Sequence, residues 1–324
     1  MKKKALTAAL AAAFVLTTAG SVFADPLEFN GQVSFQHRMN TDTTTPSNDD
    51  FSNNIFKVIL NAKAANVIDN VDLYFRFGGE HLSDAGSGRD FNKSYYGADK
   101  RSAFALDQFG FVYKAGGFNY KIGRQDITIG ATALLYNNDA NVGKHGFVDG
   151  VTVTGKSGIT DLKVIAAEAD SVSDDNDKVY SISASYPATK DLTLGATVAK
   201  YDSATDPVKD TNVYAINASY AISKKLEAFG EFAKSDASEQ NKAFDVGLNY
   251  AFDNKTSAYV ITHKTEANAD LGGNTDFENN EKGWYYGVNH KLTKDSTLKF
   301  FYKDNKIITG GKETSFRTTY VYKF

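Results

Sequence analysis

Apolar and polar side chains alternate with a period of two along much of this chain. In the segment VDLYFRF, Val71, Leu73 and Phe75 fall on one face, whereas Asp72 and Arg76 fall on the other. This period is that of a β-strand, because successive side chains of a strand point to opposite faces of its sheet. The same pattern recurs at 27–38, 56–64, 178–186, 243–252, 296–303 and 316–324. The sequence therefore predicts an all-β fold whose strands have one apolar and one polar face.

The connections between these segments alternate between short and long. The short ones are AANVIDN, KAGGF, YPATKD, AISKKL, FDNKT and LTKDS. The long ones lie near 39–52, 82–103, 126–145, 169–177, 202–211, 235–241, 265–281 and 305–313. We count about sixteen strands, and short turns at one end with long loops at the other are typical of an antiparallel transmembrane β-barrel of the outer-membrane type.

A soluble β-sandwich is the main alternative, because its strands also alternate. A sandwich must interlock its apolar face in a packed core, however, whereas here that face ends in Tyr or Phe at many strand termini. Such ends are typical of the aromatic girdle of a membrane barrel. The chain has 18 Tyr, 23 Phe and 26 Gly but only 4 Pro, which suits many strands joined by tight turns.

The first residues, MKKKALTAALAAAFVLTTAGSVFA, have the layout of a secretory signal peptide, with cleavage expected after Ala24. The alternative is an uncleaved anchor. Residues 25–324 would then form the barrel. Removing three signal lysines leaves 33 Lys+Arg against 39 Asp+Glu, a net charge of −6, so no nucleic-acid partner is expected. The chain has no cysteine, which excludes a disulfide scaffold, and we expect neither a cofactor nor a metal.

The last segment, TSFRTTYVYKF, places Tyr320, Tyr322 and Phe324 on one face. Because a sheet cannot leave a free edge in lipid, the last strand is expected to pair with the first. The segment resembles the ends of the general porins of Gram-negative outer membranes, whose terminal aromatics are read by the barrel-assembly machinery. The resemblance implies a homotrimer among outer-membrane lipid and lipopolysaccharide, with a water-filled channel for passive diffusion of small hydrophilic solutes and ions.

In general porins the third long loop folds into the barrel and narrows the pore. By position, the corresponding loop here is 126–145, and Ile127, Ile129, Leu134 and Leu135 make it more apolar than the other loops. That composition favours a segment packed against a wall, and an external flap is the alternative. The acids available to this loop at the constriction are Asp126 and Asp139.

A group of cations is predicted to face the lumen opposite that loop, as a basic wall does in the family. Its members are Arg38, Lys57, Arg76, Lys303 and Arg317, with Lys121 as an extension. All but Lys121 come from five strands that become neighbours once the barrel closes. By this register the lumen has more cations than acids, and a cationic wall facing an acidic loop would set a field across the pore. Ordinary solvated charge is the alternative, and a register shift of one residue would turn any of these cations outward.

Other functions remain open at this point. A substrate-specific channel for sugars or anions would show an aromatic ladder or a dense cation ring inside the lumen. The inward aromatics Tyr74, Tyr201, Tyr285 and Phe301 are scattered. An outer-membrane hydrolase would need a His with a Ser or acid partner. The chain has five His and no Gly-x-Ser-x-Gly. We therefore expect no enzyme. The acid-rich segment 170–178 is either a divalent-cation site shared with lipopolysaccharide or a solvated loop.

Overall fold

The structure is a computed structural model that describes residues 27–43, 50–83, 101–137, 142, 147–169, 176–204 and 210–324. The predicted signal peptide lies outside the described residues. So do Asp139, most of the loop 82–103 and most of the acid-rich segment 170–178. The described residues contain no helix that combines the length and the apolar character needed to span a membrane.

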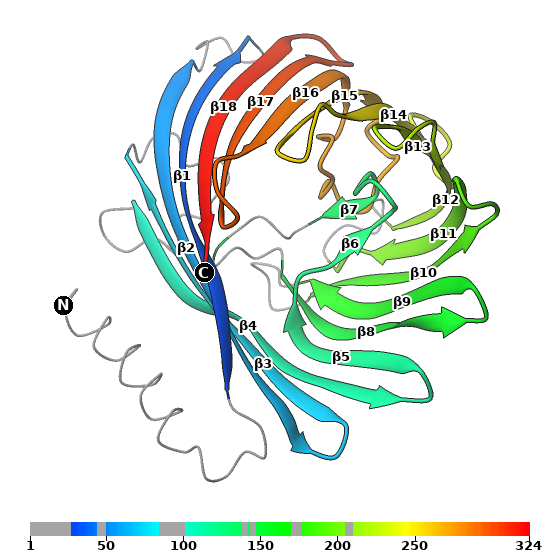
Figure 1. The fold of residues 1–324 in the computed structure, drawn as a ribbon. Helices are drawn as coiled ribbons and strands as arrows, with labels where there is room; N and C mark the ends of the chain where they lie inside the picture. Colours follow the sequence, from blue (N-terminus) through cyan, green and yellow to red (C-terminus); the bar gives the residue numbers. More distant parts are fainter. Residues whose placement is uncertain are drawn as a thin grey trace.

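The described residues form a closed antiparallel barrel of sixteen strands, and the predicted fold class is confirmed (Figure 1). The wall strands are β1 (Glu28–Asp42), β2 (Phe51–Ile68), β3 (Val71–Leu82), β4 (Ser102–Ala115), β5 (Phe118–Gln125), β8 (Val148–Ser157), β9 (Thr160–Ala169), β10 (Asp177–Pro187), β11 (Leu192–Asp202), β12 (Thr211–Ala221), β13 (Leu226–Ser235), β14 (Lys242–Ala251), β15 (Thr256–Thr265), β16 (Glu281–Lys291), β17 (Ser296–Ile307) and β18 (Lys312–Lys323). The short strands β6 (Thr128–Ile129) and β7 (Tyr136–Asn137) make a separate two-stranded sheet. Each wall strand pairs with its neighbours in sequence, except that β5 pairs with β8 across the β6–β7 segment.

The barrel closes where the first strand meets the last. β1 pairs with β18 from Gln32 opposite Lys323 to Asp42 opposite Glu313. The final residue takes part in the ladder, because the Gly31 amide donates to the Phe324 carbonyl at 2.9 Å and the Phe324 amide donates back at 3.1 Å. A Cβ at position 31 would lie 2.8 Å from the Phe324 ring. Glycine at this position therefore leaves room for the terminal ring.

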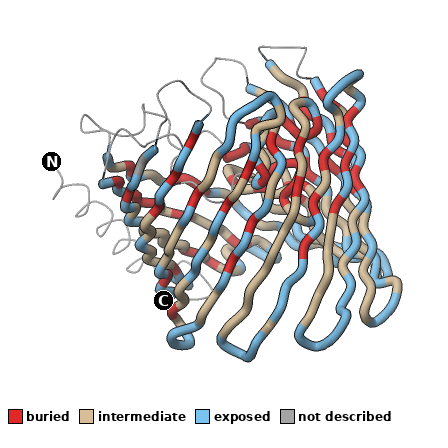
Figure 2. Tube along the Cα trace, turned by 90° about the horizontal axis from the view of Figure 1, so that it is seen from above, coloured by how far each residue is buried: buried red, intermediate tan, exposed pale blue. Residues whose placement is uncertain are grey.

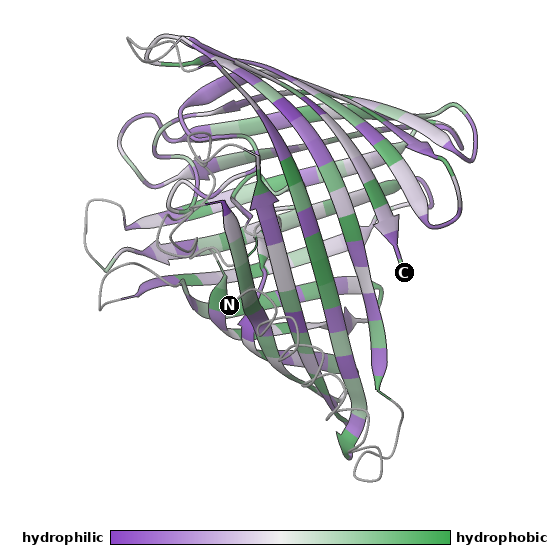
Figure 3. Ribbon diagram, turned by 90° about the vertical axis from the view of Figure 1, so that its left-hand side faces the viewer, coloured by the Kyte–Doolittle hydropathy of each residue, from purple (hydrophilic) through white to green (hydrophobic). Residues whose placement is uncertain are grey.

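The outer and inner faces of the wall follow the alternation read from the sequence, which Figure 3 shows as hydrophobic and hydrophilic bands along the strands. Tyr320, Tyr322 and Phe324 are 40–54% exposed on the outer face. The turns 188–191, 222–225, 252–255 and 292–295 lie at the end where β18 finishes. Figure 2 shows these exposed hairpins at one end and the longer connections at the other. In outer-membrane barrels the short-turn end is periplasmic and the long-loop end is extracellular.

Replacing Phe324 with Asp should sharply lower the amount of folded protein in the outer membrane. The substitution puts a charge on the outer face at the seam and removes the terminal aromatic ring. Cell fractionation followed by a heat-modifiability gel measures the folded fraction. Phe252→Asp is a matched control, because Phe252 is a similarly exposed outer aromatic at the short-turn end but lies away from the seam. Equal folded levels of the Phe324→Asp variant and the wild type would contradict the role of the terminal residue.

Candidate functional site

The segment that follows β5 turns into the barrel. Its strands β6 and β7 pair through Thr128 opposite Asn137 and Ile129 opposite Tyr136. Figure 1, which looks along the barrel, shows this small sheet inside the ring of wall strands. The described part of the predicted loop 126–145 therefore lies within the lumen and not above it.

An apolar surface fixes this inserted segment to one side of the wall. Ile127, Ile129, Leu134, Leu135 and Tyr136 are between 0% and 3% exposed. They pack with small and aliphatic inward side chains of the wall, which include Ile165, Ala167, Ala169, Val179, Ala199, Val213, Ala215, Ala233 and Ala243. Small residues at these inner positions leave space for the loop. Each buried Leu or Ile contributes about 1.5–3 kcal/mol to holding the segment in place.

Hydrogen bonds attach the same segment to wall strands far from β5. The Thr132 amide and hydroxyl both donate to the Glu231 carboxylate, at 3.1 and 3.0 Å, and the Thr132 hydroxyl lies 2.5 Å from the Asp245 carboxylate. The Lys163 ammonium donates to the Thr128 carbonyl at 2.7 Å. Because Glu231 lies on β13 and Asp245 on β14, the segment crosses the lumen from β5 to the opposite part of the wall.

Gly130 is needed where the inserted segment passes the Glu231 carboxylate. Its φ is +90°, a conformation that favours glycine. A Cβ at this position would also lie 2.8 Å from a Glu231 carboxylate oxygen. The backbone can therefore approach Glu231 closely only because residue 130 has no side chain.

A second long connection, 266–280 between β15 and β16, also folds against the inserted segment. The Leu271 amide donates to the Leu135 carbonyl at 3.0 Å, and the Asn137 amide donates to the Asn274 carbonyl at 2.6 Å. Leu271 and Phe277 are 0% and 3% exposed. Sequence reasoning missed this contact. The available signal was the presence of these two large apolar residues in a connection otherwise rich in Asp, Asn and Gly.

The connection 266–280 contains a buried carboxylate. Asp270 is 4% exposed and accepts hydrogen bonds from the Gly273 amide at 2.9 Å and the Asn279 side-chain amide at 3.0 Å. Burial raises the pKa of Asp270 to about 6, because desolvation outweighs these two bonds. The charged form is therefore disfavoured in the folded loop.

The structure places the six predicted cations on the lumen side of the wall. Arg38 and Arg317 lie directly opposite each other in the β1–β18 ladder. The Arg38 Nε donates to the Asn40 side chain at 2.9 Å. The Arg317 Nε donates to the Ser315 hydroxyl at 3.1 Å, and its guanidinium lies 5.0 Å from the centroid of the Phe301 ring. The two guanidinium groups thus stand on the same face at the seam of the barrel.

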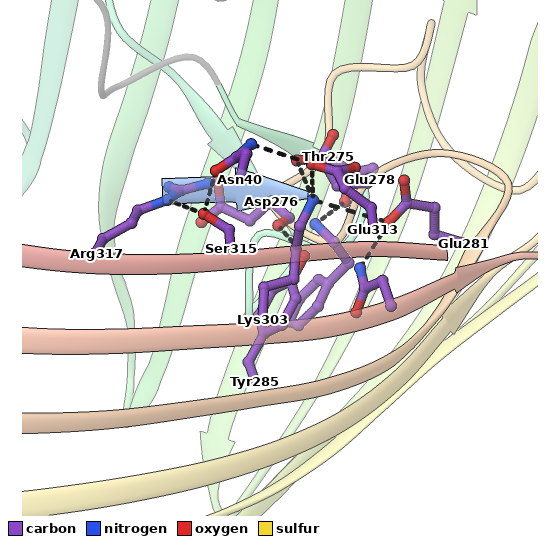
Figure 4. Close-up of polar contacts among 12 residues, drawn as sticks. Asn40, Thr275, Asp276, Glu278, Glu281, Tyr285, Lys303, Glu313, Ser315 and Arg317 are labelled. Carbon is purple, nitrogen blue, oxygen red and sulfur yellow. Dashed lines mark hydrogen bonds and ion pairs between the residues drawn. The ribbon is translucent and has the colours of Figure 1, made fainter. Parts of the chain in front are cut away.

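Lys303 lies in a cluster of carboxylates. Its ammonium is 2.9 Å from Glu313, 3.4 Å from Glu278 and 4.0 Å from Glu281, and its side chain is 1% exposed. Figure 4 shows the three carboxylates around the Lys303 nitrogen, with Tyr285 alongside. A buried ammonium requires such partners, because an unpaired charge out of water is costly.

Lys57 and Arg76 also face carboxylates on neighbouring strands. Lys57 lies 3.5 Å from Glu80, and Arg76 lies 3.0 Å from Asp107. The Arg76 guanidinium is also 5.1 Å from the centroid of the Phe147 ring. Sequence reasoning assigned the constriction acids to the loop alone. The structure adds acids that the strands themselves carry: Glu80, Asp107, Glu281 and Glu313.

Lys121 links the wall to the start of the inserted segment. Its ammonium lies 3.2 Å from Asp126 and 4.8 Å from the centroid of the Tyr74 ring. Of the two predicted loop acids, Asp126 is thus engaged by a predicted cation, and Asp139 lies outside the described residues. No group of three or more His, Cys, Asp or Glu side chains in the described part of the chain is arranged to hold a metal ion.

A cavity of about 640 Å³ lies between the inserted segment and the short-turn end of the barrel. Polar uncharged side chains are the most numerous group in its wall, and the charged residues Lys156, Asp161 and Lys163 also line it. The uncharged ones include Asn119, Thr154, Ser183, Ser185, Thr197 and Asn217. Hydroxyl and amide groups are donors and acceptors for water and for hydrophilic solutes. This half of the lumen is therefore suited to a water-filled path.

Replacing Asp270 with Asn should make folding stability less dependent on pH. The raised pKa means that Asp270 binds its proton more tightly in the folded protein than in the unfolded chain. The contribution of Asp270 to stability is therefore full below about pH 4 and is lost as pH rises through about 6. The amide of the Asp270→Asn variant stays neutral, so the variant should gain roughly 1–3 kcal/mol relative to wild type at pH 8. Thermal unfolding in detergent at pH 4 and pH 8 measures this, with Asp69→Asn in the exposed turn between β2 and β3 as control. A gain in stability that is equal at both pH values would contradict the raised pKa of Asp270.

Comparisons with known proteins agree with this architecture. The family model described as Gram-negative porin matches residues 74–240. Two engineered mutants of the porin from Rhodopseudomonas blastica have similar folds. One has a TM-score of 0.61 and the other, a triple mutant, has a TM-score of 0.60. Each is 12% identical in sequence to this chain. Each match covers 92% of this chain and 100% of the porin chain.

No curated protein sequence matches the chain. At 12% identity the solved structures support the fold alone, whereas the family match covers more than half of the sequence. The strand order, the inserted segment and the family match lead to one conclusion: the chain belongs to the Gram-negative porin family and is a channel protein of the bacterial outer membrane.

Proposed function

We propose that this porin is a general diffusion channel for small hydrophilic solutes and ions, and that the inserted segment 126–137 forms one side of its constriction. The observation that carries the proposal is the placement of that segment across the lumen, between the Lys121–Asp126 pair on the β5 side and the Glu231 and Asp245 carboxylates on the other. A segment held at both ends inside the barrel narrows any path through it.

The charges on the two sides of the lumen support passage of small polar solutes. The wall formed by β17, β18 and β1–β5 carries the cations Lys303, Arg317, Arg38, Lys57, Arg76 and Lys121. The inserted segment packs on the strands β9–β14. The basic wall and the segment therefore face each other. Charged groups on one side of a narrow aqueous path bias which ions enter it.

A substrate-specific channel is less well supported. The inward aromatics that would form a ladder are engaged in packing. Tyr201 and Tyr285 are 5% and 6% exposed. The Tyr201 hydroxyl donates to Asp177 at 2.5 Å and the Tyr285 hydroxyl donates to the Asp276 carbonyl at 3.2 Å. Phe301 lies beneath the Arg317 guanidinium. Because these aromatic rings are packed against other residues, they do not form an apolar surface for sugars along the lumen.

A hydrolase is also less well supported. His81 lies 2.8 Å from the Ser102 hydroxyl on the outer rim, which is the one Ser–His contact found among the described residues. Within that part of the chain, no carboxylate contacts the His81 ring to orient it as a base. We therefore propose that the protein has no catalytic role, and an assay of phospholipid hydrolysis with wild type and Ser102→Ala tests this. Activity that the substitution abolishes would overturn it.

The proposal extends to assembly. We propose cleavage after Ala24 from the layout of residues 1–24. We propose a homotrimer, and reading of the Phe324 end by the barrel-assembly machinery, by resemblance to the family. The outer rim of β1–β4 is a suitable subunit surface, because the residues there are polar but carry no strong charge: His37, Asn54, His81 and Ser102. Mass measurement of the detergent-extracted protein tests the trimer and the cleavage. A monomer at all concentrations contradicts the first, and an intact residue 1 contradicts the second.

Neutralising Arg38 and Arg317 together, as Arg38→Gln and Arg317→Gln, should shift ion selectivity towards cations. The two guanidinium groups are neighbours on the lumen face, and their combined field is screened beyond about 10 Å at 0.1 M salt. The shift in reversal potential across a salt gradient should therefore be largest at low salt. Neutralising Lys190 and Lys294, which are 89% and 90% exposed in side-chain area at the short-turn end, removes the same charge as a control. Equal selectivity of the lumen variant and the wild type would refute the role of the basic wall.

Deleting residues 130–135 should raise single-channel conductance and admit larger sugars. The deletion removes the part of the inserted segment that contacts Glu231 and Asp245, so the lumen widens. Planar-bilayer recordings and liposome swelling with sugars of increasing size measure the two effects. The control replaces 237–240, in the exposed connection between β13 and β14, with four glycines, which keeps the backbone carbonyls that accept hydrogen bonds from Asn268. If conductance and size cutoff are unchanged, the segment does not form the constriction.

A further inference from the structure

The connection 266–280 between β15 and β16 contacts both sides of the lumen. On one side, the Asp276 amide donates to the Ala133 carbonyl of the inserted segment at 3.3 Å. On the other, the Glu278 carboxylate lies 3.4 Å from the Lys303 ammonium on β17, which belongs to the basic wall (Figure 4). The connection therefore spans from the inserted segment to that wall and borders the path between them.

The aromatic ring of Phe277 fixes the connection to the inner face of the barrel. Phe277 is 3% exposed, and its ring centroid lies 5.1 Å from that of His263 on β15 and 5.6 Å from that of Tyr285 on β16. Aromatic rings at such separations attract one another. The residues before and after Phe277, which are Asp276 and Glu278, are both exposed. Burial of the Phe277 ring therefore leaves a carboxylate on each side of it facing the lumen.

Glu278 holds a backbone conformation that is unfavourable for a residue with a side chain. Its φ is +57°, in the left-handed region that few residues other than glycine adopt. Such a conformation persists only where the surrounding contacts impose it, and it is frequent at functional sites. Here the burial of Phe277 and the contact of the Glu278 carboxylate with Lys303 impose it.

Lys303 does not make this part of the lumen cationic. Three carboxylates lie within 4.0 Å of its ammonium, and they belong to Glu278, Glu281 and Glu313. One positive charge against three negative charges leaves a formal charge of −2. The Glu278 side chain is 48% exposed, whereas those of Glu281 and Glu313 are 7% and 17% exposed. Glu278 is therefore the member of this cluster that a passing solute meets first.

The inserted segment itself supplies little negative charge to the path. Asp126 is the one carboxylate among residues 126–137, and it is paired with Lys121 at 3.2 Å. At the other end of this segment, the Asn137 side-chain amide donates to the Asp276 carboxylate at 2.6 Å. The inserted segment therefore positions a carboxylate that the connection 266–280 contributes.

We propose that the connection 266–280 is a second constriction loop, and that Asp276 and Glu278 are the residues through which it controls ion preference, a role that rests on the diffusion channel proposed above. Carboxylates beside a narrow aqueous path attract cations and repel anions. Towards the short-turn end, the next inward charges along β18 and β1 are Arg317 and Arg38. The two carboxylates and the two guanidinium groups act in opposite directions. The connection therefore offsets the anion preference that the two arginines would give by themselves.

The first test neutralises the two carboxylates together, as Asp276→Asn and Glu278→Gln. The reversal potential across a KCl gradient in planar bilayers gives the cation-to-anion permeability ratio. This ratio should fall about twofold or more at roughly 0.1 M salt, and it should change less at about 1 M salt, where the screening length is only about 3 Å. The matched control, Glu168→Gln with Glu239→Gln, removes the same charge at exposed positions of β9 and of the connection between β13 and β14, and it should keep the wild-type ratio. Heat-modifiability gels measure folding, and the single variant Glu278→Gln replaces the double variant if the latter does not fold.

The second test releases the connection from the wall. Phe277→Ser removes the ring that packs on His263 and Tyr285 and leaves the inserted segment unchanged in sequence. Single-channel conductance should rise above that of the wild type, because the path loses the side that the connection forms. Phe252→Ser, which changes an aromatic residue that is 52% exposed on the outer face, is the control and should conduct as the wild type does.

An unchanged permeability ratio in the folded carboxylate variant, or an equal fall in its control, would overturn the role of Asp276 and Glu278. Unchanged conductance of Phe277→Ser would overturn the second constriction loop. If the deletion of 130–135 still raises conductance in these cases, the inserted segment remains the constriction and only the role of the connection is refuted. A wild-type protein that conducts no ions would refute the diffusion channel and the second constriction loop together.

Discussion

Backbone hydrogen bonding in lipid is the constraint on which the rest of this structure depends. No water reaches the middle of a bilayer, so each strand must find a partner on both sides. The chain meets this requirement by pairing β1 with β18 and by bringing the last residue, Phe324, into the ladder through two bonds with Gly31. Closure turns the polar faces of all the wall strands towards one enclosed lumen, which makes a channel possible.

The inserted segment fills part of the enclosed lumen. The chain fills it with a segment whose apolar side chains are almost fully buried inside a polar space. This is possible because β9–β14 place Ala and Val on the inner face of the extracellular half. The same strands carry Ser, Thr and Asn nearer the short-turn end, where the cavity lies. One wall thus serves as a packing surface in one half and as a wetted surface in the other.

Ion pairing within the lumen explains how the wall carries so many charges. Lys303, Arg76 and Lys57 each lie within 4.0 Å of a strand carboxylate. Pairing stabilises buried charges that would otherwise be costly and holds long side chains against the wall. Fixed charges of both signs, and not a uniform cationic surface, therefore line this side. Within that pattern Arg38 and Arg317 stand out, because the register places two like charges side by side.

The sequence alone determined the features that depend on a local period. Alternation predicted the strands and the inward direction of Arg38, Lys57, Arg76, Lys121, Lys303 and Arg317, and the apolar residues Ile127, Ile129, Leu134 and Leu135 marked the segment that packs against a wall. Contacts between distant segments were decided only by the tertiary structure. These include Thr132 with Glu231 and Asp245, and Leu271 with Leu135. The physical reason is that a period of two fixes which face a side chain takes, whereas its height and its neighbours depend on strand register and barrel closure, which join residues far apart in the chain.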